Sequence, residues 1–144
     1  MEAVRIGLSA LDVEWTRVQV IAENIANMNS VITDPASGYM PMRLISGPVR
    51  DFSAVLSSAG GAYQAPPAGV RMTGLEPVAN GLRQVHEPNH PLADQNGMVT
   101  YPKIDYATEM TLLLKASRVY EANLASVSIA QQMYSRALDM GRQS

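Results

Sequence analysis

The string His86-Glu87-Pro88-Asn89-His90 matches a zinc-peptidase pattern in residue type and spacing. In that chemistry, two histidines four residues apart bind one Zn²⁺ from the same face of a helix, and the glutamate acts as general base. Proline interrupts a helix and also disfavours helical geometry at the residue before it. Because Pro88 lies inside the string and Pro91 follows it directly, we expect a proline-rich loop and no zinc site.

A second string, Asp94-Gln95-Asn96-Gly97, resembles the opening of a calcium-binding loop. Asp105 stands in the position where such a loop has its bidentate glutamate, so we interpret the string as a turn. The sequence contains no nucleophile elbow and no glycine-rich phosphate loop. We therefore expect no catalytic residues, cofactor or metal.

Composition excludes several other classes of protein. The 144 residues fit one domain, and a hydrophobic fraction of 47% with 17% charged residues argues against a wholly disordered chain. A formal net charge of −2 provides no broad basic surface, so a nucleic-acid partner is not expected. The absence of cysteine excludes disulfides and thiolate metal sites.

No apolar run reaches the roughly 18–20 residues that a membrane-spanning helix needs. The first residues also lack a basic stretch followed by a continuous apolar segment, because Glu2, Asp12 and Glu14 interrupt them. We expect neither a membrane span nor a cleavable signal peptide.

The elements that must position any functional residues follow from the distribution of proline. All nine prolines lie between Pro35 and Pro102, which leaves proline-free flanks at 1–34 and 103–144. In the first flank, apolar residues recur at alternating spacings of three and four, which predicts a helix that buries one narrow face and ends near Asn27. This seam consists of Met1, Val4, Leu8, Leu11, Trp15, Val18, Ala22 and Ile25.

The second flank predicts a longer helix, from about 105 to 140, with two adjacent seams. At 1.5 Å per residue this helix is about 50 Å long, so a helix of roughly 25 residues cannot cover it. We expect the uncovered seam to pack on other chains and the termini to gain order on assembly. The first seam is Met110, Leu113, Ser117, Tyr120, Leu124, Val127, Gln131, Tyr134 and Leu138; the second is Leu112, Ala116, Val119, Asn123, Ser126, Ala130, Met133, Ala137 and Met140.

Between the flanks, turn residues break the chain into short pieces. Residues 30–68 form a loop-rich segment with one short extended piece at 42–45. Strands are then expected at 70–75, 82–87 and 98–101, with Asn80-Gly81 as a hairpin turn between the first two. The predicted class is α+β: an assembly helix with an Asn-rich end at 1–29, a loop-rich segment and small antiparallel β insert at 30–104, and a long assembly helix at 105–144.

Asn24 and Asn27 lie on the same side of the last turn of the first helix. Their amides either cap a frayed helix end or, if buried, hydrogen-bond to neighbouring elements and fix their register. The sequence leaves both roles open.

Residues 22–30, Ala-Glu-Asn-Ile-Ala-Asn-Met-Asn-Ser, closely resemble the N-terminal signature of the flagellar rod and hook axial protein family. Glu23 stands where that family more often has Asn, and Ser30 where it has Thr. Residues 109–110 and 116–123 resemble the family's C-terminal signature. The chain length and the stretches 87–94 and 97–105 are most similar to proximal rod subunits.

The resemblance implies a structural subunit of the bacterial flagellar basal body. Such a subunit is exported unprocessed through the flagellar type III apparatus and assembles in the periplasm with other rod subunits and itself, forming a drive shaft that transmits torque. The resemblance implies no enzymatic activity. We expect helix packing and assembly to depend on Leu8, Leu11, Trp15, Val18, Asn24, Ile25, Asn27, Met110, Leu113, Tyr120, Asn123, Leu124, Val127 and Leu138.

Two alternatives belong to other classes. A cytoplasmic coiled-coil adaptor would share the heptads but would stay in the cell whether or not flagellar export works. A zinc hydrolase built on His86 and His90 would contain zinc and lose it on His90→Ala.

Overall fold

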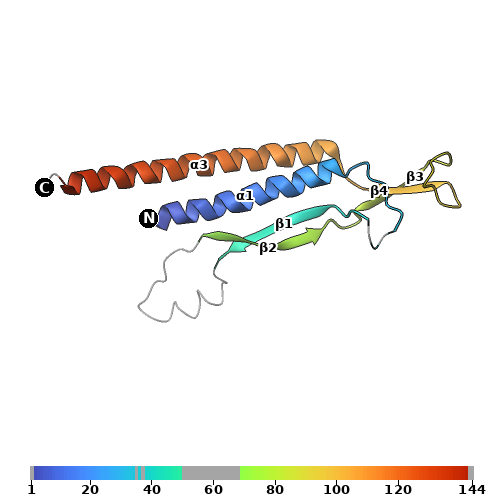
Figure 1. The fold of residues 1–144 in the computed structure, drawn as a ribbon, viewed down its shortest axis with the longest axis horizontal. Helices are drawn as coiled ribbons and strands as arrows, with labels where there is room; N and C mark the ends of the chain where they lie inside the picture. Colours follow the sequence, from blue (N-terminus) through green and yellow to red (C-terminus); the bar gives the residue numbers. More distant parts are fainter. Residues whose placement is uncertain (1, 35, 37, 50–68, 143–144) are drawn as a thin grey trace, which may run out of the picture.

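The computed structural model describes residues 2–34, 36, 38–49 and 69–142. Within these residues, two long helices, one from each end of the chain, lie side by side, and four short strands lie between them in sequence (Figure 1). This arrangement confirms the predicted α+β class. The elements are α1 (Glu2–Ala26), β1 (Met42–Pro48), β2 (Val70–Pro77), β3 (Leu82–His86), β4 (Met98–Pro102) and α3 (Tyr106–Arg142).

Local hydrogen bonds set the ends of both helices. Asp105 caps α3, because its carboxylate accepts a hydrogen bond from the Thr108 N–H at 3.0 Å and another from the Thr108 hydroxyl. At the end of α1, the Asn27 side chain donates to the Glu23 carbonyl at 2.9 Å and accepts from Ser30 Oγ. The helix end expected near Asn27 is therefore correct, and this side chain acts as a cap.

α1 lies between α3 on one side and the β1–β2 pair on the other (Figure 1). The sequence predicted one narrow buried seam on this helix, and that prediction was wrong. Leu11 of the seam is buried, whereas Leu8 and Trp15 are largely exposed, and Met1 lies outside the described residues. Val13 and Val20 are buried off the seam because α1 has a second packing face toward the strands.

The strands form two separate antiparallel pairs, β1 with β2 and β3 with β4. Leu44 is opposite Leu75 in the first pair, and Val85 is opposite Val99 in the second. The prediction of a hairpin across Asn80-Gly81 was wrong. Asn80 does form a turn, with φ of 53°, but this turn passes the chain from one strand pair to the other. Of the loop-rich segment, residues 50–68 lie outside the described residues.

A second set of buried residues lies on β4 and on the segments that join the elements. Val99 and Pro102 of β4 are almost completely buried, as are Pro41 and, at the end of α1, Asn24. The Ile32 N–H donates to the Thr100 carbonyl at 2.9 Å, so the segment after α1 runs beside β4. The strand insert is thus fixed to the Asn24 end of the helix pair.

Candidate assembly surface on the terminal helices

α1 and α3 pack antiparallel in a register defined by contacts at both ends. At one end Asn24 hydrogen-bonds to Glu109, and at the other a Cβ on Gly7 would lie 2.3 Å from Val127 Cγ2. These contacts are 17 positions apart in α1 and 18 in α3, so the two helices stay in step. Glycine at position 7 therefore allows the helices to approach closely.

Asn24 is completely buried, and both ends of its side chain are hydrogen-bonded. Its Oδ1 accepts from the Met42 N–H at 3.0 Å and from the Tyr39 hydroxyl at 2.8 Å. Its Nδ2 donates to the Met42 carbonyl at 3.0 Å and to Glu109 Oε2 at 3.4 Å. The sequence left two roles open for Asn24, a cap or a buried amide. The structure shows the second: the buried amide hydrogen-bonds to neighbouring elements and fixes their register.

Glu109 of α3 completes this cluster as a buried carboxylate, 2% exposed. Both of its oxygens accept hydrogen bonds from the two terminal nitrogens of Arg43, one of them at 3.3 Å. A bidentate guanidinium–carboxylate pair is strong and geometrically specific. We call Asn24, Tyr39, Met42, Arg43 and Glu109 the joint, because together they connect α1, β1 and α3.

The surroundings of the joint also change the pKa of the Tyr39 phenol. The pKa of Tyr39 is raised above its ordinary value, chiefly by burial and then by the negative charges of Glu23 and Glu109, while Arg43 opposes the shift. The phenol therefore remains a hydrogen-bond donor to Asn24 over the neutral pH range.

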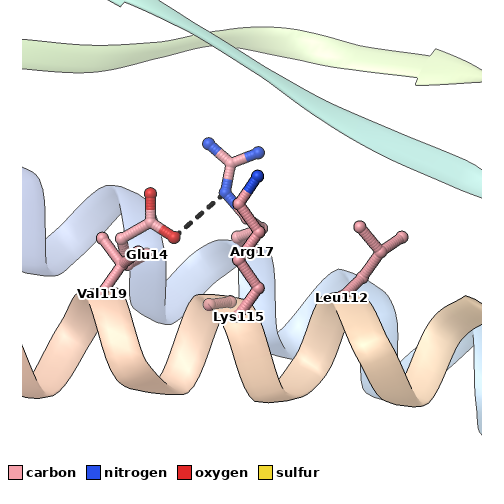
Figure 2. Close-up of a pocket in the computed structure, with 6 residues that line it drawn as sticks. Glu14, Arg17, Leu112, Lys115 and Val119 are labelled. Carbon is pink, nitrogen blue, oxygen red and sulfur yellow. Dashed lines mark hydrogen bonds and ion pairs between the residues drawn. The ribbon is translucent and has the colours of Figure 1, made fainter.

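A groove runs between the helices on the side that faces β1 (Figure 2). Glu14 and Arg17 of α1 form an ion pair of 3.1 Å at its rim, and Arg17 extends toward the strands, where it donates to Ser46 Oγ at 3.2 Å. The α3 side of the groove is formed by second-seam residues and Lys115: Leu112, Lys115, Ala116 and Val119. Of the second-seam residues in the groove, Val119 is exposed, whereas Ala116 is buried.

α3 is the longer helix and projects past the start of α1 (Figure 1). Continuing the register places Glu2 near residue 132, so the following residues of α3 have no α1 opposite them. Every residue from 131 to 142 is exposed. We call residues 133–142 the overhang; its exposed apolar side chains are Met133, Tyr134, Leu138 and Met140.

The predicted assembly residues fall into three groups by burial. The first group is buried, the second is half-buried and the third is exposed. The groups are Leu11, Asn24 and Val127; Val18, Ile25, Asn27, Met110, Leu113, Tyr120 and Asn123; and Leu8, Trp15, Leu124 and Leu138. Trp15 and Tyr120 are brought together, with ring centroids 6.2 Å apart.

Sequence reasoning missed the partners of Asn24. Arg43 and Glu109 are 66 positions apart, and no periodic pattern connects a strand residue to a residue in the first turn of a distant helix. The available signal was the residue type of Glu109: a charged side chain close to the apolar start of a seam. Sequence alone could not name its partner.

The two motifs examined for chemistry are engaged in local structure. His86 ends β3, and His90 lies in the turn after Pro88, so their imidazoles do not share a helical face. Glu87 accepts a hydrogen bond from the Tyr101 hydroxyl at 3.1 Å. Asp94 Oδ1 accepts from the N–H groups of Asn96 and Met98, both at 2.8 Å, which is the turn predicted for that string.

Comparison with known proteins gives relatives along nearly the whole chain. A protein named flagellar basal-body rod protein FlgC from Salmonella typhimurium strain LT2 is 30% identical over 134 residues, covering 93% of this chain and 92% of that protein. The chain belongs to the FlgC family of flagellar basal-body rod proteins.

Other members of the FlgC family are similar at comparable levels. The Bacillus subtilis strain 168 protein is 26% identical over 145 residues, with 97% of each chain covered. The Agrobacterium fabrum strain C58 protein is 27% identical over 138 residues, with 96% of this chain and 92% of that protein covered. The family profile described as flagellar basal body rod FlgEFG protein C-terminal matches residues 95–140, which include most of α3 and its overhang.

Membership of the FlgC family makes this chain a structural subunit of the flagellar basal-body rod, the assembly role inferred from the sequence. The chain is therefore located in the flagellar basal-body rod, where it assembles with other rod components. Among the described residues, neither helix has a stretch long and apolar enough to cross a membrane.

Proposed function

We propose that this chain builds the rod by docking the overhang of α3 onto a neighbouring rod subunit. The observation that carries the proposal is the mismatch in helix length, because α3 continues past α1 with its apolar residues exposed. Tyr134 and Leu138 continue the line along which Val127 is buried against α1, so this part of the line has a packing surface but no helix of its own chain opposite it. Large exposed apolar patches mark interaction sites.

The proposal assigns the chain a mechanical role without catalysis. The joint makes the strand insert and the two helices one connected unit, so load applied to the helices reaches the insert. Overhang contacts repeated between many subunits would then transmit torque along the rod. The role requires helix packing and no reacting group.

We also place the assembled subunit in the periplasm, reached through the flagellar type III export apparatus. Residues 2–26 form α1 and supply Asn24 to the joint, so this segment is part of the folded subunit. Its retention in the rod is expected, and the mass of the protein released from purified basal bodies would test this directly.

Deletion of the gene tests the proposed function. Loss of the chain should abolish motility and filament assembly, and a restored copy should be found in purified basal bodies only when export works. A cytoplasmic adaptor would instead remain in the cell in either case. Normal motility without the protein would overturn the proposal.

A further inference from the structure

On the surface of the helix pair, Trp15 and Tyr120 line an open pocket of about 260 Å³ together with Leu11 and Asp12. The two rings are tilted by 50° with centroids 6.2 Å apart. Trp15 is 55% exposed, so much of the indole remains open to a partner. We call these four residues the aromatic notch.

The chemistry of the aromatic notch suits a cation. Aromatic faces attract guanidinium and ammonium groups, and a carboxylate beside them adds an ion pair. The Asp12 carboxylate is exposed and makes no hydrogen bond or ion pair within the described part of the chain. A planar guanidinium could stack on a ring while hydrogen-bonding to Asp12.

Resting on the proposed function, we propose that the aromatic notch binds the Arg142 guanidinium of a second copy of this chain. Arg142 lies in the last turn of the overhang and, among the described residues, has no ion-pair partner. Helical spacing places it on the same side as Tyr134 and Leu138, since the three recur every four residues. Docking of that side would cover both apolar residues and deliver the cation to the notch.

The notch cannot take Arg142 from its own chain. Tyr120 and Arg142 are 22 residues apart on one continuous helix, which separates them by about 33 Å. An arginine side chain is far too short to span that distance. If Arg142 is the cation in the notch, it therefore comes from a neighbouring copy.

This contact joins two different surfaces, the overhang of one copy and the notch of the next. Such a head-to-tail contact does not close on itself between two copies, and its repetition generates a ring or a helical array. The proposed contact therefore has the symmetry required by a rod.

Charge exchange tests the pairing. Asp12→Arg and Arg142→Asp should each lower the amount of protein incorporated into basal bodies about tenfold, because each removes the attraction and sets like charges together. The double variant, in which the charges are exchanged, should restore much of the incorporation. Arg136→Asp is the matched control, since Arg136 lies on the opposite side of the same overhang, and it should leave incorporation unchanged.

Cysteine cross-linking provides a second measurement, because the chain has no natural cysteine. Asp12→Cys combined with Arg142→Cys should give disulfide-linked multimers in basal bodies, while each single variant should not. Incorporation without this cross-link, together with equal effects of Arg142→Asp and Arg136→Asp, would overturn the pairing and leave the proposed function standing. Failure of the wild-type chain to enter basal bodies would overturn the proposed function itself.

Discussion

The amide of Asn24 donates a hydrogen bond to the carboxylate of Glu109, a residue 85 positions away, at 3.4 Å in a buried site. Arg43 holds the same carboxylate from the other side. One polar cluster therefore fixes the end of α1, the start of β1 and the first turn of α3. A buried polar group that loses its partner destabilises the folded state. The joint therefore favours the one register of the helix pair in which all its hydrogen bonds form.

Glu109→Ala should lower the free energy of unfolding by about 2–3 kcal/mol, because Arg43 and Asn24 would both lose a buried partner. Urea titration of the purified chain measures this change. Glu121→Ala, an exposed change on the same helix, is the control and should alter stability by less than about 0.5 kcal/mol. Similar effects of the two variants would show that the joint does not stabilise the fold.

Gly7→Ala should separate α1 from α3, because the added Cβ would lie 2.3 Å from a methyl of Val127. The ordinary gain from glycine to alanine in a helix, up to about 1 kcal/mol, should be cancelled or reversed at this position. Gly141→Ala, which meets no atom within 4 Å and lies in the exposed last turn of α3, is the control and should change thermal unfolding little. Combining Gly7→Ala with Val127→Ala should give a non-additive recovery in thermal unfolding; simple additivity would argue against the close contact.

The cap of α3 should make stability depend on pH in the acid range. Hydrogen bonds from the Thr108 hydroxyl and N–H lower the pKa of Asp105 below its ordinary value of 3.8. A lowered pKa in the folded state means that the stabilisation is present above pH 3.8 and is lost as the pH falls below it. Asp105→Asn keeps a capping side chain that does not titrate, so its unfolding should be less pH-dependent; an unchanged acid dependence would exclude this role.

Much of the fold could be predicted from residue periodicity and turn chemistry. Seam spacing predicted both helices, and Asn27 marked the end of α1, because these signals are local. Strand pairing was mispredicted at Asn80-Gly81. Turn residues indicate that the chain changes direction, but they do not show whether the strands before and after the turn pair with each other. Val13 and Val20 were missed for a related reason: a heptad describes a helix with one partner, whereas α1 has two.

Burial predicts unequal protection along the helices of the isolated chain. The buried residues of α1 begin at Leu11, and those of α3 end at Val127. Amide hydrogen exchange should therefore be slow in 11–26 and 106–127 and faster in 2–10 and 128–142. Assembly into the rod should slow exchange in the second set. Uniform protection in a proven monomer would contradict the expectation that the distal parts gain order from neighbours.

Incorporation of an overhang variant into basal bodies tests the central claim most directly. Tyr134→Glu combined with Leu138→Glu places two charges on the docking side, while Ser128→Glu combined with Gln132→Glu places two at the same spacing on another, exposed side. Both variants should unfold within about 0.5 kcal/mol of the wild-type chain, since all four positions are exposed. Only the first should be absent from purified basal bodies and fail to restore motility to a deletion strain. Normal incorporation of that variant would contradict assembly through the overhang.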